Sequence, residues 1–321
     1  MTSVALAGAF AIAFAVIALA RRSSLASRLA DTPNARSLHA KPKPRVGGLG
    51  VMAGALSVIF AAGSPDLRVV AAGALGLALL SLADDMRALP APLRLLGHVV
   101  AAFVVVLGPL DAPPLAIAAL AVLSIAWMTN LYNFMDGADG LAGGMAVAGF
   151  GTLALAADAG GAADLALASG AIAAAGLAFL AFNAPPAKVF LGDAGSIPLG
   201  FLAGALGSLG IARGAWPAWF PVLVFSPFVV DASVTLLRRL AAREKIWIAH
   251  RTHYYQRLVT GGWSHRRLAL AGWAAMLAAG ASALLALEGT VMLHRGIMSV
   301  WVVAYVVALI VIDRRYPRKV P

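Results

Sequence analysis

The stretch PPLAIAALAVLSIAWMTNLYNFMDGADGLAGGMAVAGFGTLALAA, residues 113–157, places a short polar segment between two apolar runs. Each run, 113–129 and 140–157, approaches the roughly 20 apolar residues that an α-helix needs to cross a bilayer. The polar segment carries two asparagines and two aspartates at three-residue intervals. Charged side chains are costly inside hydrocarbon, so this segment is expected at a membrane surface with a function of its own.

The rest of the chain repeats this pattern of long apolar runs and short polar connections. Of its 321 residues, 61% are hydrophobic and only 12% are charged, which excludes a soluble globular domain of this size. We therefore predict an all-α, polytopic membrane protein of about 10 to 11 transmembrane helices, forming a single domain over residues 1–321. The apolar runs are 4–20, 46–63, 67–83, 94–110, 113–129, 140–157, 161–182, 197–213, 216–237, 267–287 and 291–312.

The basic residues indicate how these runs are oriented. No positive residue precedes the first run, and Arg21 and Arg22 follow it, which is the reverse of a cleavable signal peptide. With the N-terminus outside, only Arg68, Arg213 and Arg295 of the 25 basic residues lie on the outer face. The net charge of +11 is then explained by topology and by attraction to anionic headgroups, and it does not indicate nucleic-acid binding. The expected cytoplasmic segments are 21–45, 84–94, 130–140, 183–196, 238–266 and the C-terminal tail.

Carboxylates gather on this cytoplasmic face. Asp84 and Asp85 end the third run, Asp136 and Asp139 precede the sixth, and Asp193 precedes the eighth. Magnesium binds carboxylate and amide oxygens and shares its remaining positions with water and substrate phosphates, so a magnesium site is one interpretation. The alternative is that each acid pairs with a nearby Arg or Lys. The adjacent Asp84 and Asp85 are like charges, which raises one pKa of the pair and suits a general base.

The same face can also bind phosphate. Several expected helices begin there with Gly-rich sequences such as PRVGGLG, so their N-terminal amides point to the cytoplasm with the positive end of the helix dipole. For each basic residue near these helix ends, a purely topological role is the alternative. The basic residues able to reach such a site are Lys41, Lys43, Arg45, Arg94 and Lys188.

Histidines are concentrated in the last large cytoplasmic segment. His250 and His253 are three residues apart, so they can share a helical face and contact a phosphate or a sugar. Tyr254 and Tyr255, which follow directly, are of a type that is common at membrane–water interfaces.

Five motifs, in this order along the chain, resemble those of a known family, the polyprenyl-phosphate N-acetylhexosamine-1-phosphate transferases of glycosyltransferase family 4. They are RSLHAKPKPRVGGLG (36–50), LADDMRAL (82–89), NLYNFMDGADGLAGG (130–144), FNAPPAKVFLGDAGSIPLG (182–200) and HRTHYYQRL (250–258). The resemblance implies transfer of a HexNAc-1-phosphate from a UDP sugar to undecaprenyl phosphate, with release of UMP, at the cytoplasmic face of the bacterial inner membrane.

The resemblance also implies roles for individual residues. Asp193 would be the principal Mg²⁺ ligand with help from Asn133, and Mn²⁺ is an alternative metal. Asp84 and Asp85 would deprotonate or position the lipid phosphate. The other implied contacts are Asp136, Asp139 and Asn183 with the nucleotide sugar or the hydrated metal, Phe190 with the uracil ring, and His250 and His253 with the substrate phosphates.

Departures from the family pattern narrow the expected substrate. The family often has Lys and then Gln where this chain has Arg94 and His98, and both replacements can still donate to phosphate. Peptidoglycan enzymes have adjacent histidines where this chain reads HRTH, which argues against a MurNAc-pentapeptide substrate. HRTHYYQRL is instead similar to the branch that starts O-antigen synthesis with GlcNAc or a 6-deoxy relative such as FucNAc or QuiNAc.

Two other functions are alternatives to this prediction. One is the phospho-MurNAc-pentapeptide transferase reaction, and the other is transport or lipid flipping. Transporter sites usually lie near the bilayer midplane, whereas Asp231 is the one conspicuous acid that lies well inside an apolar run. A homodimer, and the choice between direct attack and a covalent intermediate, are left open by the sequence.

Overall fold

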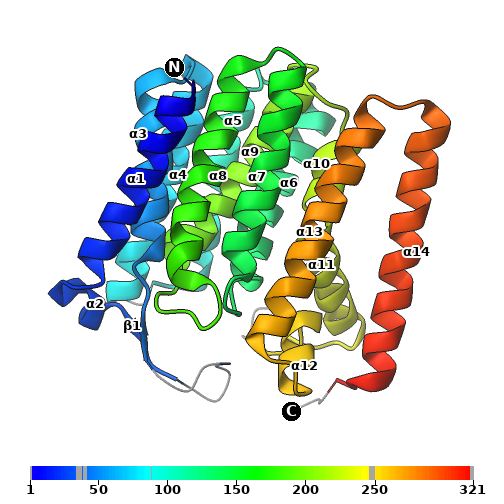
Figure 1. The fold of residues 1–321 in the computed structure, drawn as a ribbon. Helices are drawn as coiled ribbons and strands as arrows, with labels where there is room; N and C mark the ends of the chain where they lie inside the picture. Colours follow the sequence, from blue (N-terminus) through cyan, green and yellow to red (C-terminus); the bar gives the residue numbers. More distant parts are fainter. Residues whose placement is uncertain (1, 34–37, 39–41, 88, 246–249, 319–321) are drawn as a thin grey trace.

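The computed structural model describes residues 2–33, 38, 42–87, 89–245 and 250–318 (Figure 1). Within these residues the chain is almost entirely helical, which confirms the predicted all-α class. In chain order the elements are α1 (Thr2–Ala20), α2 (Ser24–Arg28), β1 (Ala30–Asp31), β2 (Lys43–Pro44), α3 (Gly47–Ala62), α4 (Pro65–Arg87), α5 (Ala91–Leu107), α6 (Leu115–Phe134), α7 (Leu141–Ala159), α8 (Ala163–Asn183), α9 (Asp193–Ala212), α10 (Trp219–Val224), α11 (Ser226–Ala241), α12 (Tyr254–Thr260), α13 (His265–Leu287) and α14 (Val291–Arg315).

The predicted membrane spans appear as long apolar helices. Among the described residues, eight helices are long and apolar enough to cross a membrane, namely α1, α4, α6, α7, α8, α9, α13 and α14. The shorter apolar helices α3 and α5 account for two more of the predicted runs. The protein is therefore a multi-pass membrane protein. The N-terminus and the C-terminus lie at opposite ends of the helices (Figure 1).

The predicted run 216–237 is divided into α10 and α11, which the sequence analysis did not anticipate. The two helices meet at Phe225, just before Pro227. Proline has no backbone N–H and cannot continue the helical hydrogen-bond ladder. The Leu223 carbonyl, which an N–H at position 227 would have contacted, accepts a bond from the Ser226 hydroxyl at 2.6 Å instead.

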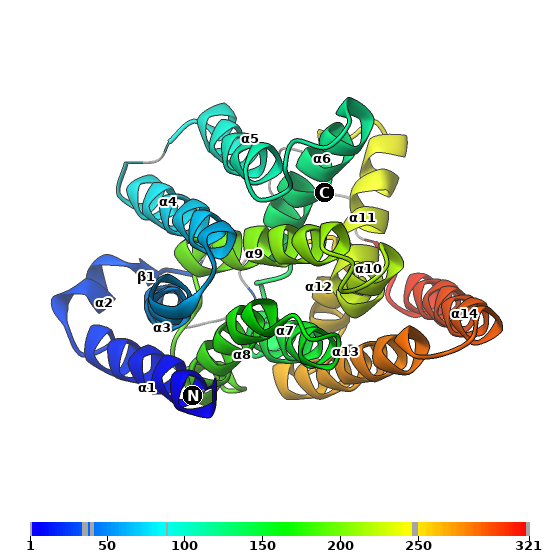
Figure 2. The same ribbon diagram turned by 90° about the horizontal axis from the view of Figure 1, so that it is seen from above.

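The helix α9 lies at the centre of the bundle, with α4 and α6 on one side and α7 and α8 on the other (Figure 2). Its first turn packs tightly against α3, because Gly48 and Gly195 face each other so closely that a Cβ on either would overlap the other's backbone. Small residues permit such close contact between membrane helices. The N–H of Gly48 donates to the Leu191 carbonyl at 2.8 Å, which fixes the segment that leads into α9.

An ionic cluster connects α4, α8 and α9 at the end of the bundle opposite to the start of α9. Arg213, which follows α9, binds Asp66 at the start of α4 at 2.7 Å and Asp164 at the start of α8 at 2.8 Å. Carboxylates at helix N-termini and a guanidinium after a helix C-terminus are favourably placed in the helix dipoles. These acids and Arg213 all belong to the face that the sequence analysis assigns to the outside.

Candidate functional site

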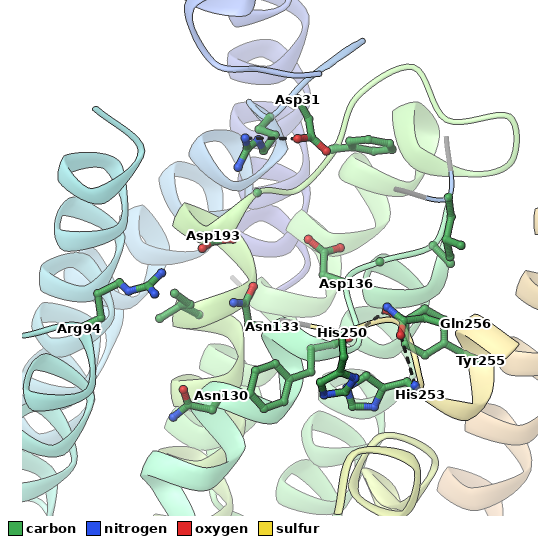
Figure 3. Close-up of a pocket in the computed structure, with 18 of the residues that line it drawn as sticks. Asp31, Arg94, Asn130, Asn133, Asp136, Asp193, His250, His253, Tyr255 and Gln256 are labelled. Carbon is green, nitrogen blue, oxygen red and sulfur yellow. Dashed lines mark hydrogen bonds and ion pairs between the residues drawn. The ribbon is translucent and has the colours of Figure 1, made fainter. Parts of the chain in front are cut away.

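A cavity of about 590 Å³ lies where α6 ends and α9 begins, at the same end of the bundle as α12 (Figure 3). It opens on the face at which the basic segments of the chain collect. Most residues predicted as functional line it, although they come from five separate parts of the chain. These are Arg45, Arg94, Asn133, Asp136, Asn183, Phe190, Asp193, His250 and His253. Lys41, which was also predicted to contact substrate, lies outside the described residues.

Three side chains with carboxylate or amide oxygens line this cavity. Asn133 lies in the last turn of α6, Asp136 follows the helix, and Asp193 is the first residue of α9. Figure 3 shows the three side chains between Arg94 on one side and His250 and His253 on the other.

Asp193 was expected in a different local structure. The prediction placed Asp193 in the loop before a helix that starts at 197, but α9 begins four residues earlier. Gly192, at φ 74°, makes the turn before the helix in a conformation that glycine adopts without strain.

The carboxyl groups of the cavity create a place for a cation. Burial, and then the charge of Asp193, raise the pKa of Asp136 well above its ordinary value. Two carboxylates that oppose each other's ionisation are stabilised when a positive ion lies between them. The hydroxyl of Ser196 donates to the Asn133 amide oxygen at 2.6 Å, which fixes the orientation of that amide.

These groups fit magnesium better than a metal that needs a complete protein cage. Among the described residues, no three His, Asp or Glu side chains form a potential metal-binding cluster. Magnesium is typically held by one or two carboxylates, with water and substrate phosphates completing its shell. Asp193, Asp136 and the Asn133 amide supply that kind of partial set, so they fit the predicted metal.

Two arginines supply positive charge at the cavity wall. The Arg94 guanidinium donates to Asp84 at 2.9 Å, and the Arg45 guanidinium contacts Asp85 at 3.3 Å. Asp84 and Asp85 lie in the last turn of α4 and are not among the described residues that line the cavity. They pair with arginine, which is the alternative that the sequence left open, and thereby hold both guanidiniums at the site.

Asp31 is a cavity residue that the sequence analysis missed. Its carboxylate lies 3.3 Å from the second terminal nitrogen of Arg45 and lines the cavity. The antiparallel pairing of β1 with β2, in which Asp31 faces Lys43, carries it there. One signal was present in the sequence, because Asp31 is the only acid in the basic segment 21–45.

The predicted residue Asp139 is bound to other parts of the chain beside the cavity residues. Its side chain is buried and accepts a bond from the Ala187 N–H at 2.9 Å, and it is not among the described residues that line the cavity. Lys43 lies 3.5 Å from the same carboxylate and 4.8 Å from the centre of the Phe190 ring. Asp139 thus positions Lys43 beside the aromatic ring that was predicted to stack on uracil.

Asn183 lines the cavity, and both the oxygen and the nitrogen of its side-chain amide form hydrogen bonds with backbone groups. Its oxygen accepts from the Gly140 N–H at 2.8 Å, and its nitrogen donates to the Val189 carbonyl at 2.9 Å. The residue therefore joins the start of α7 to the segment that carries Phe190.

The two predicted histidines meet in a way that the sequence did not indicate. His250 lies in a loop and His253 precedes α12, so they do not share a helical face. Their rings nevertheless stack, with centroids 4.9 Å apart. The buried Asp231 accepts bonds from the N–H groups of Tyr254 and Tyr255, both at 2.9 Å, and lies 3.3 Å from Nδ1 of His253. It satisfies amides that the first turn of a helix leaves without a partner.

His250 is neutral in this arrangement. Burial, followed by the neighbouring His253, lowers the pKa of His250 to about 3. Its Nδ1 accepts from the Thr252 N–H at 3.3 Å, so the single proton of the neutral ring resides on Nε2.

Tyr254 and Tyr255 are buried, so their interpretation as membrane-interface aromatics is wrong. The Tyr255 hydroxyl donates to the Phe134 carbonyl at 2.9 Å and fills the space that a Cβ on Gly137 would need. In this way α12 packs against the loop that carries Asp136.

Comparison with known proteins identifies the family. Over 337 aligned positions the chain is 30% identical to a protein of Mycolicibacterium smegmatis named decaprenyl-phosphate N-acetylglucosaminephosphotransferase, with 89% of this chain and 82% of the relative covered. The family description Glycosyl transferase family 4 matches residues 67–210. The chain belongs to glycosyl transferase family 4. The resemblance found in the five sequence motifs is thereby confirmed at the level of the family.

Two further relatives align with shorter parts of the chain. A probable undecaprenyl-phosphate N-acetylglucosaminyl 1-phosphate transferase of Bacillus subtilis is 28% identical over 266 residues, covering 77% of this chain and 74% of the relative. A phospho-N-acetylmuramoyl-pentapeptide-transferase of Shouchella clausii is 33% identical over 157 residues, covering 48% of this chain and 46% of the relative. The family match runs from α4 to α9, so it includes Asp136 and Asp193 but ends before the histidine segment.

Proposed function

We propose that the protein transfers a HexNAc-1-phosphate from a UDP sugar to undecaprenyl phosphate, releasing UMP at the cytoplasmic face of a bacterial inner membrane. The observation that carries the proposal is the cavity itself, which Asp193, Asp136 and Asn133 line together with the basic residues Arg45 and Arg94. Two family members that match most of the chain are named for transfer of an N-acetylglucosamine phosphate to a polyprenyl phosphate.

The charges of the cavity suit a phosphoryl transfer. Such a reaction asks the protein mainly for positioning and for neutralisation of the phosphate charges. Asp193, Asp136 and Asn133 would hold Mg²⁺, or Mn²⁺ in its place, and the bound metal would supply positive charge beside the diphosphate. Arg45 and Arg94 supply fixed positive charge from the other wall, and Asp84 and Asp85 keep these two guanidiniums in place.

The reaction exchanges one phosphorus–oxygen bond for another. An oxygen of the anionic lipid phosphate attacks the β-phosphorus of the UDP sugar. The bond from that phosphorus to the oxygen bridging the α-phosphate breaks, and UMP leaves with the electron pair. Neutral His250 offers its Nε2–H as a donor to phosphate oxygen, and Phe190, beside Lys43, provides the aromatic surface for uracil.

The donor sugar is proposed to be GlcNAc or a 6-deoxy relative such as FucNAc or QuiNAc, and the product to start O-antigen or a related polysaccharide. The coverage of the relatives supports a sugar without a peptide. Relatives named for N-acetylglucosamine phosphate transfer match 77% and 89% of this chain, whereas the pentapeptide transferase cited above matches 48%. The spacing of His250 and His253 also differs from the adjacent histidines of peptidoglycan enzymes.

The test is turnover by the purified protein with undecaprenyl phosphate and a panel of UDP sugars, with and without Mg²⁺ or Mn²⁺. We expect metal-dependent UMP release with one or a few HexNAc donors, and loss of turnover in Asp193→Asn. The matched control is Asp158→Asn, which removes an exposed carboxylate near the opposite end of the bundle. Absence of UMP release with every donor, or full turnover by Asp193→Asn, would refute the proposal.

The same preparation separates direct attack from a covalent intermediate. We propose direct attack, since Arg94 can hold the lipid phosphate in the cavity that receives the donor. Exchange of labelled UMP into the UDP sugar should then require lipid phosphate. Exchange in the absence of lipid would indicate a phospho-sugar enzyme instead.

A further inference from the structure

The end of α14 is bound to the short helix α12, which follows the cavity histidines. Asp313, in the last turn of α14, accepts from the Arg257 guanidinium at 2.8 Å and also binds Arg238. Past the end of α14, the Tyr316 carbonyl accepts two further bonds from Arg257, at 3.0 and 2.6 Å. Arg257 lies in α12, so one guanidinium joins α12 to both Asp313 and Tyr316.

This connection differs from the rest of α14. None of the residues of α14, all of which are described, is buried, and the helix stands at the edge of the bundle (Figures 1 and 2). The Arg257 side chain, by contrast, is only 6% exposed. A buried guanidinium is stable only when its donors are paired, so Arg257 holds α12 and the end of α14 in a fixed relation.

The chain just before the histidines is bound to the same terminal region. Glu244 contacts Arg239 of α11 at 3.4 Å and also pairs with Arg318, which follows α14. Arg239 additionally donates to the Lys245 carbonyl at 2.9 Å. Residues 313–318 therefore contact the chain on both sides of His250 and His253.

The geometry of the cavity depends on where α12 lies. A helix of seven residues is too short to be stable by itself, so tertiary contacts must fix its position. Asp231 holds the first turn of α12 through two backbone N–H groups, and Arg257 holds its last turn. The His253 ring precedes this helix and stacks on His250, so a shift of α12 moves both imidazoles.

We propose that residues 313–318 form a clasp that sets the position of His250 and His253 in the cavity, with Asp313 and Tyr316 as positioning residues. The inference rests on the function proposed above, because it assigns a catalytic consequence to this contact. The family description matches residues 67–210 and does not include the clasp.

The test compares Asp313→Asn with Asp66→Asn in the full-length protein. Both carboxylates bind an arginine near a helix end, but Asp66 does so on the opposite face. We expect kcat/KM for the UDP sugar to fall in Asp313→Asn on the order of 10- to 100-fold, as displaced catalytic groups typically cause. Asp66→Asn should keep the wild-type value, and Asp313→Glu, which retains the carboxylate, should recover most of the loss.

Hydrogen exchange gives a second readout that needs no turnover. The amides of α12 should exchange faster in Asp313→Asn than in wild type, whereas those of α9 should not change. If Asp313→Asn does not fold, Arg257→Lys is measured, since it keeps the positive charge but replaces the two guanidinium nitrogens that bond to the Tyr316 carbonyl with a single ammonium. Its effects should be smaller and in the same direction.

The outcomes separate the clasp from the proposed function. If wild type releases no UMP with any donor, the proposed function fails, and the exchange of α12 alone decides whether Asp313 fixes this helix. If the variants melt at lower temperature but keep wild-type kcat/KM, the contact is merely stabilising and the clasp is refuted. Unchanged α12 exchange in Asp313→Asn, or in Arg257→Lys where that variant replaces it, also refutes it.

Discussion

The imidazole of His250 lies in the cavity wall without a charge, because burial and then His253 lower its pKa to about 3. In an unfolded chain the same group titrates near 6.5. Between about pH 3 and pH 6.5, His250 therefore binds a proton more readily in the unfolded chain than in the folded protein. The contribution of neutral His250 to the free energy of unfolding is therefore fully present above about pH 6.5, and it is lost as the pH falls towards about 3.

This difference predicts how replacement of His250 changes the pH dependence of stability. His250→Gln removes the group that prefers to be protonated in the unfolded state. The melting temperature of the variant should thus fall less than that of wild type between about pH 7.5 and about pH 5. Equal falls in wild type and His250→Gln would contradict the low pKa.

The sequence predicted most side chains of the site but not their partners. The types and positions of Asp136, Asp193 and His253 follow from where carboxylates and histidines collect on one membrane face. That Asp84 pairs with Arg94 in particular could not be foreseen, because the choice of partner depends on how α5 returns beside α4. Asp31 was missed for the same reason, since only the contact between β1 and β2 brings it to Arg45.

At the scale of elements, the crossing of α3 and α9 positions the side of the cavity that carries Asp193. A Cβ on Gly48 would overlap the backbone of Ala194 and Gly195, next to Asp193. Backbone atoms in a helix cannot rotate away as a flexible side chain can, so the two helices would have to separate.

Gly48→Ala should therefore lower both stability and turnover. Overpacking of this kind typically costs about 1 to 3 kcal/mol, and the shift displaces the start of α9. The measurements are the melting temperature and kcat/KM of the purified protein. Gly8→Ala is the control, because no described atom lies within 4 Å of a Cβ added there. If Gly48→Ala behaves like Gly8→Ala, the crossing is looser than the structure indicates.

The long helices could be predicted because each is apolar over the length of a membrane span. Breaks and short helices could not, since a helix surrounded by lipid and protein is apolar on all sides and shows no periodic pattern. The division at Phe225 depends on Pro227 and on the Ser226 hydroxyl. The short helix α12 depends on contacts with two other helices. Asp231 of α11 accepts from its first turn, and its own Arg257 binds Asp313 of α14.

At the scale of the whole molecule, the orientation in the membrane is testable because the chain contains no cysteine. Ala159, at the end of α7, and Ala242, just after α11, are both exposed and lie at opposite ends of the bundle. In intact cells whose outer membrane is made permeable, an impermeant maleimide should label Ala159→Cys but not Ala242→Cys. Inverted inner-membrane vesicles should give the opposite result, and labelling in the reverse order would mean that the cavity faces outwards.

The lack of buried residues in α14 has an evolutionary consequence. Selection on most of this helix should act on composition, because any apolar side chain satisfies a position that faces lipid. Related chains should therefore drift freely over the middle of α14, except near Tyr305, whose hydroxyl contacts Ser226 at 2.7 Å. From Asp313 onwards, fewer substitutions should be tolerated. The helix before it needs only apolar side chains, whereas Asp313 makes specific contacts with Arg257 and Arg238.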